Sequence, residues 1–429
     1  MATVREAAQR ARKASYRLQA IPSDARDRAL GAIADELKRS ARTIVAANAK
    51  DLKSAEQAGL ASPLLKRLKY DSQKVEESIE SLRSLIAQED PIGRVLSRTE
   101  LDKGLILEKV SCPIGVIGVV FESRPDALVQ ISALCLKSGN AVLLKGGSEA
   151  KNTNETLAKV ITEASKSVDE RFSDAVQLLS TREEFRELLK QDDLIDLIVP
   201  RGSNELVRSI KESTKIPVLG HAAGICHTYV DEDADVDMAI EVCYDAKCQY
   251  PAVCNAMETL LVHRRIGKKF LPRMVRKFAE AKVELRGDEE TRHIVETKAA
   301  SDDDWYTEYN DLILSVRIVD SLEEAIEHIN RCGSHHTDAI VTNDGARAKR
   351  FMEGVDSSSV MWNCSTRFSD GYRYGLGAEV GISTNKTHAR GPVGLEGLTI
   401  YKWRLSGHGQ IVADYVGKGA KKFTHRRLG

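Results

Sequence analysis

The sequence lacks several features that would assign it to common functional classes. Lysine plus arginine and aspartate plus glutamate number 63 each, so neither sign of charge dominates. Nucleic-acid binding and membrane-surface binding both need a basic excess, and the balance argues against them. No apolar run reaches the roughly 18 residues that a membrane span requires. We therefore expect neither nucleic-acid nor membrane partners.

The eight cysteines show neither a disulfide framework nor a metal-binding pattern. They are scattered through 429 residues, which is typical of reduced thiols. The metal-ligand candidates that lie near one another in the sequence are Cys243, Cys248, Cys254, His227 and His263. Their spacings contain no C-x₂-C pair, so we expect no metal. His335 and His336 enter an expected strand on opposite faces, so at most one of them can line a site.

The chain also lacks two sequence signals, a secretory signal and a dinucleotide-binding fingerprint. The first 20 residues have no apolar h-region, so they are not a secretory signal. Their arginine content leaves a transit peptide as an alternative, but the apolar spacing favours a first helix, and we expect a cytoplasmic location. No G-x-G-x-x-G fingerprint follows any expected strand. A dinucleotide site, if present, must therefore use other turns.

Hydrophobic spacing divides the chain into segments. Residues 1–90 carry apolar side chains three and four residues apart, which predicts helices. Two extended runs around Asp102–Lys103–Gly104 predict a hairpin. β-rich runs then alternate with helical stretches, and this rhythm restarts after residue 231, which predicts two α/β units with parallel sheets. Further expected strands are residues 216–220, 398–405 and 409–416.

Two of the expected strand-to-helix turns carry small residues. The first is Lys145–Gly146–Gly147–Ser148, and the second is Arg201–Gly202–Ser203. Glycine lets the backbone approach a ligand closely, and a helix N-terminus favours an anion. Either turn alone is an ordinary connection, but two in one sheet favour a dinucleotide site.

The stretch YPAVCNAMETLLVH (250–263) places Cys254 in a polar loop ahead of an expected strand. Cys135 lies instead within an apolar helical stripe and is interpreted as a small core residue. A nucleophilic cysteine needs help to ionise, because the unperturbed thiol pKa is about 8.5. From the residues alone, catalytic and structural roles for Cys254 stay equally open.

Seven stretches in a constant order give the chain a specific resemblance over nearly its whole length. They are FESRPDALVQISALCLKSGNAVLLKGG, DLIVPRGSNELVR, IPVLGHAAGICHTYVDEDAD, QYPAVCNAMETLLVH, DWYTEY, GSHHTDAIVT and the block from WNCSTRF to LTIYKW. Together they resemble the γ-glutamyl phosphate reductase family of the aldehyde dehydrogenase superfamily. The last block is the most specific of them.

The resemblance implies an α/β, aldehyde dehydrogenase-like fold in three parts. A Rossmann-like NADP-binding domain would comprise residues 1–94, 113–230 and 365–388. An α/β catalytic domain would comprise residues 231–364. A small β oligomerisation arm, residues 95–112 and 389–429, would join subunits into a homodimer or homotetramer.

The reaction implied is the NADPH-dependent reduction of L-glutamyl 5-phosphate to L-glutamate 5-semialdehyde and phosphate. It is the second step of proline biosynthesis from glutamate, with glutamate 5-kinase as the pathway partner. Cys254 matches the nucleophile that forms a thioester. Ser123 falls at the position of the oxyanion donor. Val218 replaces the glutamate with which oxidising relatives activate water, which suits a reductase because such a water would destroy the thioester.

The resemblance also carries binding residues onto this sequence. Ser148 stands where NAD-preferring relatives have a glutamate, and its neutrality favours the 2′-phosphate of NADPH. The cofactor-binding residues are Lys145, Gly147, Ser148, Gly202, Ser203 and Glu308. The substrate-binding residues are Arg124, Asn363, Ser365, Thr366, Arg367, His388 and Arg390. For His388 and Arg390, a structural role between domains is an equal alternative.

Three other functions compete with this interpretation. A CoA-acylating dehydrogenase would share the thioester, but the block from WNCSTRF to HARGP argues against it. A catalytically silent scaffold is disfavoured by the intact CNAMET and KGGS stretches. A cysteine hydrolase would need a histidine–aspartate partner pattern that the sequence does not show.

Overall fold

The structure is a computed structural model that describes residues 3–428. An N-terminal helical layer forms as expected, because its apolar residues recur on one face of each helix. Thr3 and Glu6 form a capping box that satisfies the first N–H groups of α1. The helices are α1 (Val4–Leu18), α2 (Ser23–Arg39), α3 (Ala41–Gln57), α4 (Ser62–Leu68) and α5 (Ser72–Ile86).

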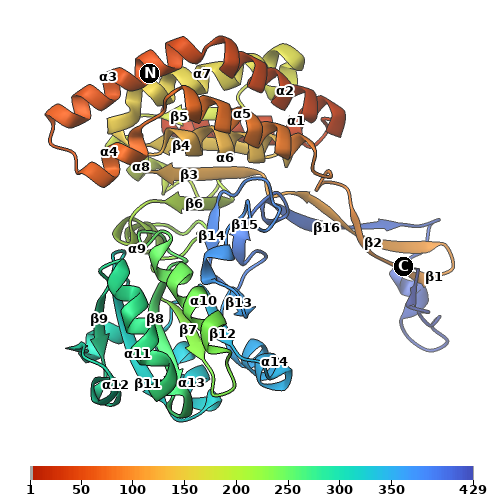
Figure 1. The fold of residues 1–429 in the computed structure, drawn as a ribbon. Coiled ribbons are helices and arrows are strands. Elements are labelled where there is room, and N and C mark those ends of the chain that lie inside the picture. The colour runs from red at the N-terminus through yellow and green to blue at the C-terminus, as the bar shows by residue number, and fades with distance from the viewer. Residues whose placement is uncertain (1–2, 429) are drawn as a thin grey trace.

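The first sheet is four-stranded and parallel, in the order β5-β4-β3-β6. Every residue of β3 and β4 is buried, as strands covered on both faces require. Helix α1 packs on β3 and β4, while α6 and α7 pack against each other and against α2 (Figure 1). The strands are β3 (Val116–Phe121), β4 (Ala141–Gly146), β5 (Val176–Leu179) and β6 (Leu197–Arg201). The helices are α6 (Pro125–Lys137), α7 (Lys151–Val168), α8 (Arg182–Leu188) and α9 (Asn204–Ser213).

The second sheet is seven-stranded and parallel throughout, in the order β10-β9-β11-β8-β7-β12-β13. Its strands are β7 (Cys226–Val230), β8 (Met257–His263), β9 (Glu284–Gly287), β10 (Lys298–Ala299), β11 (Ile313–Val319), β12 (Thr337–Val341) and β13 (Ser359–Trp362). Its helices are α10 (Val236–Cys248), α11 (Arg264–Glu280), α12 (Glu289–Ile294), α13 (Leu322–Cys332) and α14 (Gly345–Gly354). Strand β7 belongs to this sheet, so the sheet starts at Cys226, ahead of the restart that was expected after residue 231.

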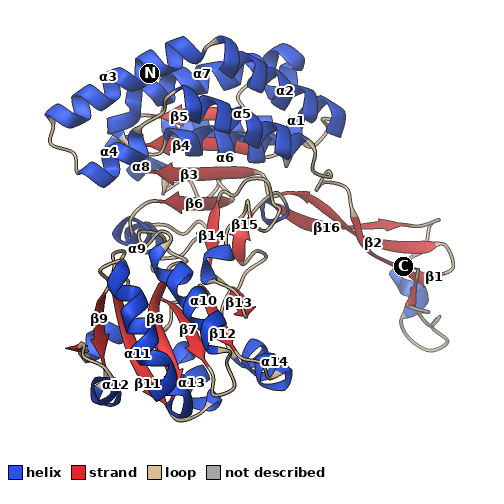
Figure 2. Cartoon of the chain, in the orientation of Figure 1, coloured by secondary structure: helices blue, strands red, loops and turns tan. Residues whose placement is uncertain are grey.

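An antiparallel arm projects from the body, with strand order β16-β2-β1-β17 (Figure 2). Its strands are β1 (Val95–Asp102), β2 (Leu105–Pro113), β16 (Thr399–Ser406) and β17 (Arg426–Arg427). The hairpin between β1 and β2 turns at Lys103 and Gly104, as predicted, and Gly104 has a positive φ of 71°.

Two expected strands are wrong. Residues 409–416 contain a 3₁₀ turn at Val412–Tyr415 instead of a strand. Gly409 and Gly417, each with a φ of 90°, turn the chain on both sides of that segment. Residues 216–220 form a single bridge, between Val218 and Ile198, because Pro217 has no N–H for a ladder.

A two-stranded hairpin of β14 (Gly381–Ser383) and β15 (Gly391–Val393) lies between the two parallel sheets (Figure 1). The predicted division into three domains otherwise stays a prediction, and its outer bounds at residues 1 and 429 lie outside the described residues. Within residues 3–428, no helix combines the length and the apolar character needed to cross a bilayer.

Candidate active site

A cleft of about 1870 Å³ opens where the loops after β3, β4 and β6 face the loop before β8. Loops that follow parallel strands meet at one edge of the sheet, so the fold brings distant motifs together. The predicted residues that line this cleft are Ser123, Arg124, Lys145, Gly147, Ser148, Gly202, Ser203, Cys254, Glu308 and Arg367.

The loop after β4 is tightly built. A Cβ on Gly146 would lie 2.2 Å from Nδ2 of Asn154, so this position tolerates no side chain without a shift. Lys145 is buried, and its Nζ donates to the carbonyl of Gly146. Ser148 opens a short 3₁₀ turn, Ser148–Ala150, that leads into α7. The backbone of this turn is thereby presented to the cleft.

The loop after β6 reaches across the cleft to the second unit. Ser203 caps α9, with its Oγ 3.3 Å from the N–H of Leu206, and its own N–H donates to Oε2 of Glu122 at 3.1 Å. Glu308 comes from the opposite side of the cleft and accepts from Nδ2 of Asn204 at 2.5 Å. This hydrogen bond therefore links the two sides of the cleft, where the predicted cofactor residues Ser203 and Glu308 lie.

Glu149 is a cleft residue that sequence reasoning missed. Its Oε1 accepts from both the N–H and the Oγ of Ser123, each at 2.7 Å. These bonds support a left-handed backbone at Ser123, where φ is 45°. The hydroxyl of Ser123 therefore points at Glu149 in this state. The available signal was a carboxylate directly beside Ser148, on the same turn.

The backbone of the Cys254 loop is held from below by β7 and the residues before it. A Cβ on Gly224 would lie 2.2 Å from the carbonyl oxygen of Cys254, so only glycine allows this approach. The thiol of Cys226 donates to the same carbonyl at 3.2 Å. Burial raises the pKa of Cys226, so it stays a protonated donor. Nδ2 of Asn255 donates to the carbonyl of Ser369 at 2.8 Å.

An ion pair lies beneath this loop. Nζ of Lys247, at the end of α10, is 2.6 Å from Oε2 of Glu258 in β8, and both side chains are fully buried. Oε1 of Glu258 also accepts from the N–H of Asn310 at 3.2 Å. The pair ties the helix before Cys254 to the strand after it, and it fixes both ends of the loop.

Two arginines lie near the thiol. Burial lowers the pKa of Arg124 and of Arg367, and in both cases the Cys254 thiolate opposes that shift. Nε of Arg367 donates to Oε1 of Gln249 at 2.9 Å. Partly desolvated guanidinium groups beside this thiol suit an anionic substrate at the same place.

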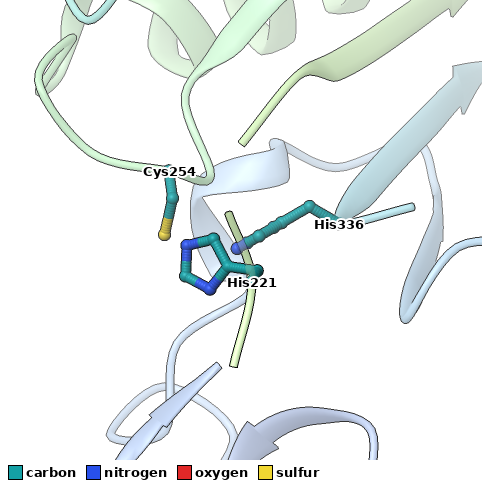
Figure 3. A group of neighbouring side chains, drawn as sticks. All are labelled: His221, Cys254 and His336. Atoms are coloured by element: carbon teal, nitrogen blue, oxygen red, sulfur yellow. The ribbon is translucent and has the colours of Figure 1, made fainter. Parts of the chain in front are cut away.

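His221 and His336 join Cys254 in one cluster (Figure 3). The ligand atoms of the three side chains lie within 4.8 Å of one another. His336 comes from the GSHHTD stretch, whereas His335 turns away and bonds the carbonyl of Asp356 at 2.8 Å. One histidine of the pair therefore joins the cluster, consistent with alternation, although His336 is fully buried and does not line the cleft. His221 was visible in the sequence only as the residue three positions after Val218.

The metal-ligand candidates weighed from the sequence do not assemble around Cys254. Cys243 is buried in an apolar cluster of the second unit. His227 pairs with Asp338 at 2.8 Å, and His263 caps α11. The expectation of no metal stays a prediction.

Five predicted substrate residues do not line the cleft: Asn363, Ser365, Thr366, His388 and Arg390. Asn363 bonds both backbone groups of Thr342, at 2.9 and 3.0 Å. Ser365 caps the turn Thr366–Phe368, and Thr366 is fully buried.

His388 and Arg390 are held by the polypeptide itself. Nε2 of His388 lies 3.0 Å from the carbonyl of Gly397. Arg390 binds the side chain and the carbonyl of Asp356, each at 3.0 Å. Val218 also lies outside the cleft lining and packs against the hydrophobic core around the four-stranded sheet. These contacts favour the structural alternative for His388 and Arg390.

Comparisons with known proteins agree with this geometry. The aldehyde dehydrogenase family model matches residues 1–309. A gamma-glutamyl phosphate reductase of Pelotomaculum thermopropionicum is 57% identical over 423 residues, covering 99% of this chain and 97% of the relative. The crystal structure of gamma-glutamyl phosphate reductase from Thermotoga maritima matches with a TM-score of 0.93 at 38% identity, covering 96% of this chain and 100% of that one.

A more distant structural match shows the fold alone. A glyceraldehyde-3-phosphate dehydrogenase from Methanocaldococcus jannaschii, complexed with NADP, has a TM-score of 0.67 at 19% identity and covers 94% of this chain and 94% of its own.

Proposed function

Because this chain belongs to the γ-glutamyl phosphate reductases of the aldehyde dehydrogenase family, we propose that Cys254 is its nucleophile. The reaction reduces γ-glutamyl phosphate to glutamate 5-semialdehyde, a step of proline biosynthesis. The thiolate attacks the acyl carbon, phosphate leaves, and a thioester remains on Cys254. Splitting the reduction this way gives each half a good leaving group.

The convergence of Cys254, Arg124 and Arg367 in one cleft with the two cofactor loops carries this proposal. The arginines offer charge-assisted donors to the acyl phosphate and to the developing oxyanion. The glutamyl end needs donors as well, and Arg124 and Arg367 are the predicted substrate residues that line the cleft. Ser123 reaches an oxyanion only after its hydroxyl exchanges its bond to Glu149.

The family uses a pyridine nucleotide, and we assign NADPH. The residues present fit such a group: a helix N-terminus at Ser203, a close-packed glycine turn at Gly146 and Gly147, and Lys145 within the turn. A bound reduced nicotinamide supplies the hydride. Ser148 removes one carboxylate from the turn, but Glu149 keeps another nearby, so the preference over NADH rests on where Glu149 points.

The reverse reaction tests the function. The purified chain receives glutamate 5-semialdehyde, NADP and inorganic phosphate, and NADPH absorbance is followed, with Cys254→Ala alongside. We expect phosphate-dependent NADPH formation that falls roughly 10⁴-fold or more in the variant. Cys135→Ala is the matched control, because that thiol is buried in the core. NADPH formation without phosphate would contradict the proposal and indicate a hydrolytic dehydrogenase.

We infer a homo-oligomer from the arm. Large apolar side chains are exposed on β16 and on the turn after it, where a lone subunit would leave them in water. They include Ile400, Tyr401, Trp403, Leu405, Ile411 and Val412. Light scattering would give a dimer or tetramer, and Trp403→Lys would shift it toward monomer. A monomeric parent would contradict the inference.

The pathway implies an enzyme that supplies the acyl phosphate and a cellular location for the reaction. An acyl phosphate is made by a kinase, so glutamate 5-kinase is the proposed pathway partner. We place the reaction in the cytoplasm.

A further inference from the structure

His221 has no role in the reaction described so far, yet it lies beside the nucleophile. Its Nδ1 is 2.9 Å from the carbonyl oxygen of Ile382 in β14. A carbonyl only accepts, so Nδ1 carries the ring proton and Nε2 keeps a lone pair. Figure 3 shows a ring nitrogen of His221 facing the Cys254 sulfur. The backbone of β14 thus sets the tautomer that a proton acceptor needs.

The surroundings keep this imidazole neutral. Burial lowers the pKa of His221, so the unprotonated form dominates at neutral pH. The ring of His336 meets it edge to face, with centroids 4.8 Å apart. Nε2 of His336 is buried without a partner among the described residues. The other charged groups that act on His221 are Arg201, Glu308 and Glu379.

A zinc ion is the competing occupant of these three side chains. Bonds of about 2.0–2.3 Å would bring tetrahedral ligands to roughly 3.5 Å from one another, whereas here they spread to as much as 4.8 Å. Cys254 must also stay open to an acyl carbon. The arrangement therefore suits proton transfer better than metal binding.

Resting on the proposed function, we propose that His221 is the general base for Cys254. Nε2 takes the thiol proton as the S–C bond forms and the C–O bond to phosphate breaks, and the imidazolium then gives that proton to the departing phosphate. After hydride addition, the C–S bond breaks, the carbonyl re-forms and the thiolate regains a proton from solvent through His221. One proton and one hydride are consumed per aldehyde, so the sequence balances.

Alkylation of Cys254 tests the base without any turnover. Iodoacetamide is added between pH 6 and 10, and modification of the Cys254 peptide is followed by mass spectrometry. We expect His221→Asn to slow modification at pH 7 about tenfold, with the two profiles converging above pH 9, where the thiol ionises unaided. His335→Asn is the matched control, since that residue turns away from the site and asparagine tolerates its φ of 60°. Identical profiles for His221→Asn and parent would overturn the proposal.

A second measurement separates a base from a structural residue. His221→Asn should lower kcat by 10²- to 10⁴-fold with little change in KM, the range typical of a lost general base. Added imidazole should restore part of the activity to His221→Ala. Loss of activity with normal alkylation and no imidazole rescue would overturn the assignment. If the parent itself fails in the phosphate-dependent assay but His221→Asn still slows alkylation, the proposed function fails and the base does not.

Discussion

Two groups of predicted site residues differ in whether they line the cleft: those in the turns after β4 and β6, and those in the C-terminal block. On the cofactor side, the residues expected from the turns after β4 and β6 all line the cleft. In the C-terminal block, the most specific stretch of the sequence, Arg367 lines it while Asn363 and Arg390 bind the chain itself. The end of a parallel strand determines the edge of the sheet at which the following loop lies, so residues in such loops can be placed from the sequence. A family-specific motif shows only that its residues are constrained, and the constraint can be structural as well as functional.

The largest expected effect tests whether the stability of the unit that carries Cys254 depends on the buried ion pair between Lys247 and Glu258. Glu258→Gln leaves Lys247 charged and unpaired, which should cost about 3–5 kcal/mol of the free energy of unfolding. Replacing both with Met and Leu should be nearly neutral for stability, because no buried charge remains. Urea denaturation of the single and double variants measures both.

The contrast for that pair is the ion pair between Arg390 and Asp356 in the C-terminal block. Asp356 is partly exposed, so Asp356→Asn should cost no more than about 1 kcal/mol. Equal losses for Glu258→Gln and Asp356→Asn would mean that burial does not distinguish the two ion pairs.

The next effect sharpens the comparison between arginines. Arg124→Gln should lower kcat/KM for the acyl phosphate by roughly 10²- to 10³-fold, as for the loss of one preorganised donor. Arg390→Gln should leave kcat/KM within about twofold, since its donors are held by Asp356. Steady-state kinetics compares them. A larger loss in Arg390→Gln would return the C-terminal block to the substrate site.

The smallest effect concerns the choice between NADPH and NADH at the turn after β4. Ser148→Glu adds a second carboxylate beside Glu149, and repulsion should shift the preference from NADPH toward NADH about tenfold. Ser148→Gln matches it in shape without the charge and should shift little. The ratio of kcat/KM values for the two cofactors measures this. Equal shifts in both variants would show that size, not charge, matters at Ser148.

Much of the fold could be predicted because hydrophobic spacing reports local periodicity. The helices before residue 90, the hairpin of β1 and β2 and the two parallel sheets appear as the pattern predicted, except that β7 of the second sheet precedes the restart expected after residue 231. The misplaced strand at residues 409–416 has apolar residues, but within residues 3–428 it belongs to no sheet. A β pattern becomes a strand only where a partner satisfies its backbone.

Residue order and spacing were enough to predict the family, the two parallel sheets and Cys254 as the candidate nucleophile, because each of these depends on local pattern. The tertiary structure alone decided that Glu149 binds Ser123 and that Gly224 fits under Cys254. It also decided that Ile382 orients His221. Each of those contacts joins residues about 25 to 160 positions apart in the chain, through a hydrogen bond or, for Gly224, a close steric approach. Periodicity carries no information about such pairs. Strand pairing within each sheet brings the first two pairs together, and the β14–β15 hairpin brings Ile382 to His221.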